Sequence, residues 1–154
     1  MKNHVYKYTE TEDVIFITNL KFRTFENEWL KIHESGVIVV KGSNGNGYSW
    51  DGCSPKIELF DLIIGTPDGR IELSTDKPLT YYASMLHDIL YQFKEYIFVT
   101  RREADQLFYT ILKMKKFFWA DVYFYVVRLF GWIYGDWNYK KSFQYKVRVE
   151  KIVL

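Results

Sequence analysis

Three side chains in the stretch from Leu79 to Phe108 have the types and spacing for acid–base chemistry. His87 and Asp88 are adjacent in the middle of one apolar-periodic run, and Asp105 lies near the start of the next. Histidine titrates near neutral pH, and a carboxylate that orients the imidazole turns it into a general base for water. This pattern indicates a candidate hydrolytic centre carried by two helices.

The second run carries a clear signal for where its helix begins. Thr100 is followed three residues later by Glu103, which is the capping-box pattern, in which each side chain accepts a hydrogen bond from a backbone N–H group. The first run predicts a helix that begins near residue 79 or 80 and ends near residue 93 or 94. Together they predict an antiparallel helical hairpin.

The expected geometry of this hairpin brings His87 and Asp105 together. At 1.5 Å per residue, His87 lies roughly 9 Å before the end of the first helix and Asp105 about 6 Å beyond the start of the second. These heights nearly match, so Asp105 is expected to orient His87. Asp88 is rotated by about 100° from His87 and faces a different partner. Ser84 and Tyr91 share the face of His87.

A glycine- and asparagine-rich segment, residues 42–55, supplies a second set of candidate residues. Such a backbone adopts positive φ and turns tightly. Its end places the carboxylate of Asp51 and the hydroxyl of Ser54 on a turn stiffened by a proline, with Gly52 between them. A loop of this kind offers carbonyl oxygens to a hard cation or N–H groups to an anion.

Composition narrows the classes of function. The 154 residues include 21 Lys and Arg against 19 Asp and Glu, and this near balance argues against a binder of long nucleic acid. Cys53 is the only cysteine, which excludes an internal disulfide and favours a reducing compartment. The N-terminus lacks the apolar core of a signal peptide, so we expect a cytoplasmic protein.

The apolar pattern along the chain predicts an α+β fold in a single domain, residues 1–154. We expect an N-terminal antiparallel sheet, a C-terminal half with three helices including the helical hairpin, and a final strand that returns to the sheet. The predicted strands are residues 5–8, 14–17, 22–25, 36–40, 71–73 and 143–154. Residues 29–33 are ambiguous, and residues 57–64 form a strand or an irregular segment.

The third helix is predicted over residues 117–134, which are apolar almost all round. Asp121 and Arg128 interrupt this run, and these charges with its modest length argue against a membrane span. A helix of this character is expected in the core, with an interfacial helix as the less favoured alternative.

Four short motifs in fixed order resemble a family of small phage and prophage proteins of unknown function. They are D-G-C-S-P at residues 51–55, H-D-I-L-Y at 87–91, R-x-x-A-D-x-x-F at 101–108 and V-R-L-F-G at 127–131. The resemblance covers roughly residues 36–135. It implies a viral origin and a location in the host cytoplasm, without supplying an activity.

The helical hairpin is also similar to the catalytic hairpin of calcium-dependent phospholipases. That similarity implies that His87 is the base, that Asp105 orients it, and that Tyr91 supports it through a hydrogen bond. It implies that Asp88 binds calcium together with the loop from Tyr48 to Ser54. The glycines of this loop are placed differently from the phospholipase pattern, since they precede Tyr48.

The first hypothesis is therefore a hydrolase acting on an ester or phosphoester of a small molecule or lipid. His87, oriented by Asp105, activates water, and a calcium ion held by Asp88 and Asp51 stabilises the oxyanion. In a variant of this mechanism Ser54 is the nucleophile.

Two other hypotheses remain open. One is a non-enzymatic phage accessory protein that binds a protein partner or a host small molecule such as a signalling nucleotide. The loop residues Tyr48 and Gly52, together with Arg101 and Arg102 at a helix start, are its binding candidates. The other is a purely structural network of buried polar side chains that joins the hairpin to the loop.

Overall fold

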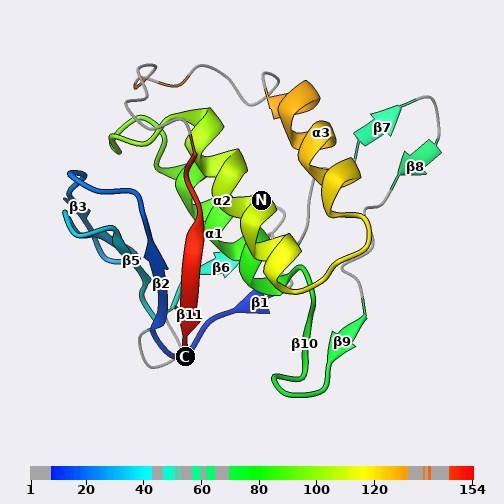
Figure 1. Ribbon diagram of the computed structural model, residues 1–154, viewed down its shortest axis with the longest axis horizontal. Coiled ribbons are helices and arrows are strands. Elements are labelled where there is room, and N and C mark those ends of the chain that lie inside the picture. The colour runs from blue at the N-terminus through cyan, green and yellow to red at the C-terminus, as the bar shows by residue number, and fades with distance from the viewer. Residues whose placement is uncertain are drawn as a thin grey trace, which may run out of the picture.

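The computed structural model describes residues 8–42, 47–50, 52, 57–59, 62–64, 70–131, 137, 139 and 146–154. A five-stranded antiparallel sheet lies on one side, two neighbouring helices occupy the centre, and a third helix lies on the far side of them (Figure 1). The fold is α+β, as the sequence predicts.

The sheet has the strand order β11-β2-β5-β4-β3, and every neighbouring pair is antiparallel. Its strands are β2 (Val14–Thr18), β3 (Phe25–Glu26), β4 (Leu30–Ile32), β5 (Val37–Val40) and β11 (Val149–Val153). Alternate residues of β2 are buried, beginning with Val14, because successive side chains point to opposite faces of a sheet. The final strand pairs with β2, which confirms the predicted return of the chain to the sheet.

Within the residues that the structure describes, three further antiparallel strand pairs lie outside this sheet. They are β1 (Tyr8–Thr9) with β6 (Ser49–Trp50), β7 (Ile57–Leu59) with β8 (Leu62–Ile64), and β9 (Ile71–Glu72) with β10 (Lys77–Pro78).

The helices are α1 (Tyr81–Gln92), α2 (Arg101–Met114) and α3 (Ala120–Phe130). The capping box at α2 is confirmed: the N–H of Glu103 donates to Thr100 Oγ1 at 3.2 Å, and the N–H of Thr100 donates to Glu103 Oε2 at 2.8 Å. Thr80 precedes α1 without a side-chain cap.

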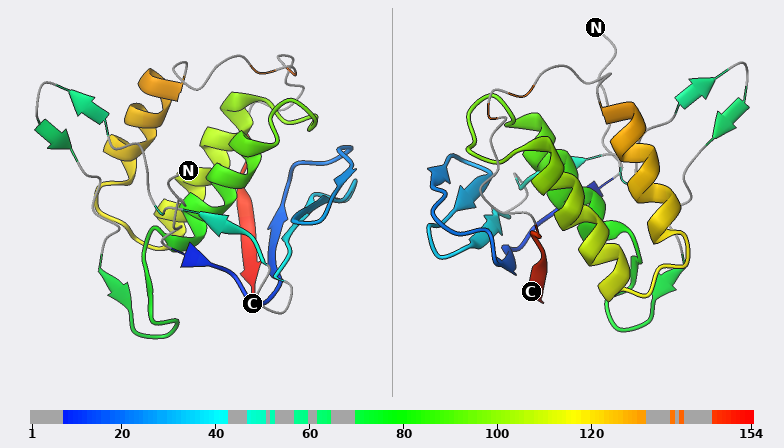
Figure 2. Two further views of the ribbon diagram at one scale, coloured as in Figure 1. Left: turned by 180° about the vertical axis from the view of Figure 1, so that it is seen from behind. Right: turned by 45° about the horizontal axis from the view of Figure 1, so that its top comes forward.

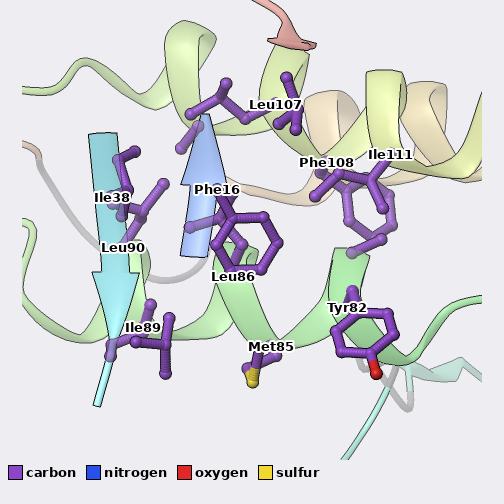
Figure 3. Close-up of a cluster of buried hydrophobic side chains, with 14 of the residues drawn as sticks. Phe16, Ile38, Tyr82, Met85, Leu86, Ile89, Leu90, Leu107, Phe108 and Ile111 are labelled. Atoms are coloured by element: carbon purple, nitrogen blue, oxygen red, sulfur yellow. The ribbon is translucent and has the colours of Figure 1, made fainter. Parts of the chain in front are cut away.

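The core lies between the sheet and the α1–α2 hairpin. Phe16 of β2 and Ile38 of β5 point toward Leu86 and Leu90 of α1, with Leu107 of α2 above them (Figure 3). All five side chains are fully buried. Burial of one sheet face against the apolar face of each helix fixes the hairpin on the sheet.

Two sequence predictions are wrong in this region. The run predicted as a core helix becomes a peripheral helix, since α3 lies on the side of α2 away from the sheet and buries only Ala120, Tyr123 and Val127 (Figure 2). The strand predicted at residues 22–25 is reduced to its last residue because Phe22 has a positive φ of 62°, which an extended strand does not accommodate. The ambiguous residues 29–33 contain β4, and residues 143–145 of the predicted last strand lie outside the described residues.

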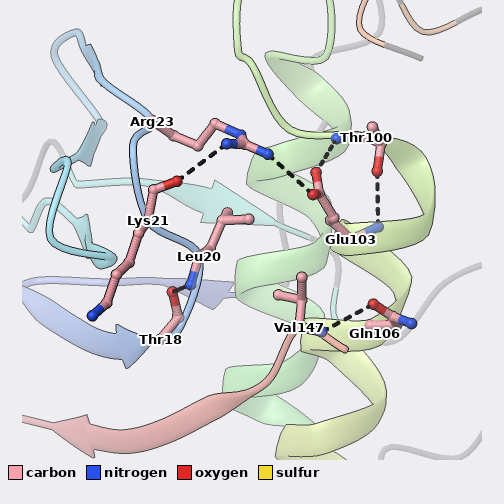
Figure 4. Close-up of polar contacts among 8 residues, drawn as sticks. All are labelled: Thr18, Leu20, Lys21, Arg23, Thr100, Glu103, Gln106 and Val147. Atoms are coloured by element: carbon pink, nitrogen blue, oxygen red, sulfur yellow. Dashed lines mark hydrogen bonds and ion pairs between the residues drawn. The ribbon is translucent and has the colours of Figure 1, made fainter. Parts of the chain in front are cut away.

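A buried ion pair ties the sheet side of the molecule to the start of α2 (Figure 4). Arg23 Nη2 lies 3.3 Å from Glu103 Oε1, and Arg23 Nη1 donates to the carbonyl oxygen of Lys21. Glu103 is fully buried and also belongs to the capping box with Thr100. Glu103, two residues before Asp105, is thereby held by Arg23 on one side and by Thr100 on the other, which fixes the first turn of α2.

Replacing Arg23 with methionine is expected to lower the free energy of unfolding by about 3–5 kcal/mol, because it leaves the buried carboxylate of Glu103 without its cation. Urea unfolding followed by circular dichroism measures the change. The matched control is Lys31→Met, which breaks an exposed ion pair with Glu26 and should leave stability nearly unchanged. Equal effects of the two substitutions would contradict this role for Arg23.

Candidate functional site

His87 and Asp105 meet in the interior of the hairpin, as the helix heights predict. His87 Nε2 and Asp105 Oδ1 are 2.9 Å apart, and both residues are buried. An ionised carboxylate only accepts hydrogen bonds, so Nε2 carries the proton of this bond. The neutral imidazole therefore has its unprotonated lone pair at Nδ1.

Asp105 collects hydrogen bonds from both of the other helices. Tyr91 of α1 donates its hydroxyl to Oδ1 at 2.7 Å, and Arg128 of α3 donates from Nη1 to Oδ2 at 2.9 Å. Burial acts to raise the pKa of Asp105, but the hydrogen bond and charge of His87, with the bonds from Tyr91 and Arg128, outweigh it and lower the pKa. Asp105 is thus a buried anion fixed in position by three donors.

Asp88 lies on the other side of the imidazole from Asp105, beside His87 Nδ1, although the helix geometry predicts that it faces a different partner. Its Oδ1 is 3.9 Å from His87 Nδ1, which is too long for a hydrogen bond but close enough for electrostatic attraction. About a quarter of the Asp88 side chain is exposed. Burial acts to lower the pKa of His87, yet Asp105 and Asp88 together raise it above its ordinary value.

Aromatic rings fix the orientation of the imidazole. The His87 ring lies 4.2 Å from that of Tyr91 and 4.9 Å from that of Phe108, measured between ring centroids. Trp137 in turn packs edge-on against Tyr91. Burial and the neighbouring charge of Asp105 raise the pKa of Tyr91, so its phenol stays protonated and remains a hydrogen-bond donor to Asp105.

Helix α3 contributes two residues to which sequence reasoning assigned no role. Arg128, a charge within an otherwise apolar run of the sequence, forms the ion pair with Asp105. Gly131 ends α3 where a Cβ atom would lie 2.9 Å from Tyr91 Oη and 3.3 Å from Arg101 Nη1. The available signal was the V-R-L-F-G motif, which places Arg128 and Gly131 one helical turn apart and so on one face.

The two arginines predicted to bind an anion occupy different environments. Arg101 is half-buried beside Tyr91 and Gly131, and its charge acts to lower the pKa of Tyr91. Arg102 is exposed. The structure therefore brings Arg101 to the site and leaves Arg102 at the surface.

The described part of the loop approaches α1 one turn before His87. Trp50 Nε1 donates to Ser84 Oγ at 3.2 Å, and Gly52 has a positive φ of 82°. Tyr48 is buried and stacks on Trp50, so it belongs to the core. The other two loop candidates, Asp51 and Ser54, lie outside the described residues.

The predicted calcium ligands are thus described only in part. Asp88 lies beside His87 Nδ1 with an oxygen donor of the type that calcium prefers. Among the residues placed by the structure, no three or more His, Cys, Asp or Glu side chains form a cluster able to hold a metal ion.

No protein-family model, curated protein or solved structure matches this chain. Within the described residues, no helix is long and apolar enough to cross a membrane.

The raised pKa of His87 predicts how stability depends on pH. Between the unfolded-state pKa, near 6.5, and the higher folded-state value, the folded protein holds a proton that the unfolded chain has lost. The free energy of unfolding should therefore be greatest below about pH 6.5 and decline as pH rises through the folded-state pKa. Urea unfolding at a series of pH values measures this decline, and His87→Gln should remove it.

The matched control for this experiment is His33→Gln. His33 is exposed between β4 and β5 and hydrogen-bonds to the Ser35 hydroxyl. This variant should keep the decline seen in the wild type. A decline of the same size in His87→Gln would show that another group causes it.

Proposed function

We propose that this protein is a hydrolase in which His87 activates a water molecule for attack on an ester or phosphoester. The observation that carries the proposal is the 2.9 Å contact between His87 Nε2 and the buried Asp105, which leaves Nδ1 as the basic atom. A base oriented by a fixed carboxylate is the arrangement that general-base catalysis requires.

Each group around the pair of His87 and Asp105, which we call the dyad, has a defined part in such a reaction. Water attacks the carbonyl carbon or the phosphorus while its proton passes to His87 Nδ1. Asp105 stabilises the imidazolium that forms, and the imidazolium then returns the proton to the departing alkoxide. Tyr91 and Arg128 keep Asp105 ionised and immobile, since both donate to it. They are positioning residues.

A calcium ion suits the side of the imidazole where Asp88 lies. Calcium takes six to eight oxygen ligands, and Asp88 supplies a partly exposed carboxylate 3.9 Å from Nδ1. The remaining ligands in this proposal come from Asp51, from loop carbonyl groups and from water. When bound, the ion supplies stabilisation of the oxyanion that develops on the substrate.

The resemblance to the phospholipase hairpin supports the same proposal, and the phage resemblance supports the location proposed below. The H-D-x-x-Y and A-D-x-x-F segments meet through His87, Tyr91 and Asp105, and Phe108 packs against the imidazole. Under this proposal the protein works in the cytoplasm of the phage host, on a small-molecule or lipid ester.

Replacing His87 with asparagine is expected to lower the hydrolysis rate roughly a hundredfold or more, the usual contribution of a general base. Turnover of phospholipid and nitrophenyl ester substrates, with and without calcium, measures the loss. His33→Asn is the matched control, because it removes an exposed imidazole and should retain full activity. Activity in the wild type should rise with pH as His87 loses its proton.

Unchanged turnover in the His87→Asn variant would end the proposal. Labelling of Ser54 by a serine-directed phosphonate would instead assign the nucleophile to that hydroxyl, with His87 as its base. Under the water mechanism, Ser54→Ala retains activity and no label is incorporated.

A second candidate function is the binding of an anionic small molecule such as a cyclic dinucleotide. The observation in its favour is Arg101, a half-buried guanidinium beside the Tyr91 hydroxyl. Isothermal titration should show binding by the wild type and by Arg102→Gln, which removes the same charge from the exposed neighbour. Binding should be lost in Arg101→Gln. Absence of heat with wild-type protein would remove this candidate.

A further inference from the structure

The face of α3 that points away from α2 is apolar along its whole length. Val122, Tyr125 and Leu129 follow one another at intervals of three and four residues, which places them in one line on α3, and Phe118 lies two residues before the helix begins. Their exposed fractions range from 48% for Val122 to 84% for Phe118. These four residues form what we call the outer stripe.

The outer stripe lies opposite the face by which α3 is held. The buried residues Ala120, Tyr123 and Val127 are rotated by about half a turn from it, at 100° per residue. A surface helix normally places polar residues on its solvent face, and a helix that is apolar all round is normally buried. Contiguous exposed apolar surface marks an interaction site, whereas isolated exposed apolar residues are ordinary.

The surroundings of the outer stripe indicate the chemistry of its partner. Lys113 and Lys116 are exposed at the end of α2, just before Phe118. Trp119, about half exposed, packs edge-on against the Phe118 ring. An apolar helix face that combines Trp and Tyr with flanking lysines is the composition of a helix that lies in a membrane interface, where the lysines attract anionic headgroups.

Charge near the stripe is not wholly positive. Asp121 is exposed on α3, but it accepts hydrogen bonds from Tyr109 and Lys113, so one lysine compensates it. Lys115 is similarly paired with Glu72, and Lys116 adds a further positive charge to this end of the helix.

We infer that the outer stripe docks on an anionic lipid surface, with α3 parallel to the plane of the membrane. The helix has 11 residues and is therefore about 16 Å long, which is about half of the hydrocarbon thickness that a spanning helix must cross. Insertion of the stripe to the depth of the headgroups buries its four apolar side chains and leaves the opposite face on α2.

This docking does not depend on the proposed hydrolysis. It has a consequence for that reaction, because Arg128 of the same helix donates to Asp105. The helix that binds lipid thus also supplies one of the hydrogen-bond donors to Asp105. The site would therefore lie close to the membrane surface when the stripe is docked.

Co-flotation with vesicles tests the inference. The full chain should bind vesicles of phosphatidylcholine and phosphatidylglycerol more strongly than vesicles of phosphatidylcholine alone, and added salt should weaken the binding. The double variant Phe118→Ser, Leu129→Ser should bind the anionic vesicles at least about tenfold more weakly, since two apolar side chains no longer leave water.

The matched control is Phe22→Ser. Phe22 is 86% exposed, like Phe118, but it lies in the segment between β2 and β3, on the opposite side of the molecule from α3 (Figure 1), so its loss should leave vesicle binding unchanged. His87→Asn should also bind normally, so a failure of docking is distinguishable from a failure of hydrolysis.

Three outcomes would overturn the inference. These are no binding of the wild type to either vesicle, equal binding to both vesicles, and undiminished binding by the double variant. Analytical ultracentrifugation supplies the alternative: a wild-type dimer that the double variant abolishes, without vesicle binding, would assign the stripe to a second copy of this chain.

Discussion

The buried carboxylate of Asp105 is the interaction on which the rest of the helical half depends. A charge moved out of water costs many kcal/mol unless it is paired and hydrogen-bonded. Asp105 meets this requirement with donors from both other helices: His87 and Tyr91 from α1, and Arg128 from α3. The same three bonds that make its burial tolerable also fix the imidazole and leave Nδ1 as the basic atom. Folding and the proposed chemistry therefore place the same demand on this residue.

The position of Asp105 is set in turn by the start of α2. The capping box of Thr100 and Glu103 defines where the helix begins, and the ion pair of Glu103 with Arg23 anchors that turn beside the sheet. Asp105 follows Glu103 by two residues, so the rotation and height of its side chain are fixed by the same turn. The sheet, although it contributes no residue to the dyad, thus takes part in positioning it.

The parts of the structure that the sequence predicts correctly depend on short-range features of the chain, such as helix caps and helical geometry. The capping box, the helical rise and the match in height predict the contact of His87 with Asp105, because they depend on neighbours along the chain. Arg128 could not be assigned its role, since its partner lies 23 residues away and depends on how α3 packs. The same reason explains the wrong prediction for α3. The apolar character of this run indicates that the helix is buried, but it does not identify the element that covers it. In the described structure, only the side of α3 that carries Ala120, Tyr123 and Val127 is buried.

The tautomer of His87 decides whether Asp105 orients the imidazole as a base. Nitrogen-15 NMR of the imidazole, recorded at a pH where His87 is neutral, distinguishes a protonated ring nitrogen from an unprotonated one. We predict a proton on Nε2, shared with Asp105, and an unprotonated Nδ1 that is able to accept a proton from water. A proton on Nδ1 with Nε2 unprotonated would contradict this prediction, because Asp105 would then be unable to orient the base.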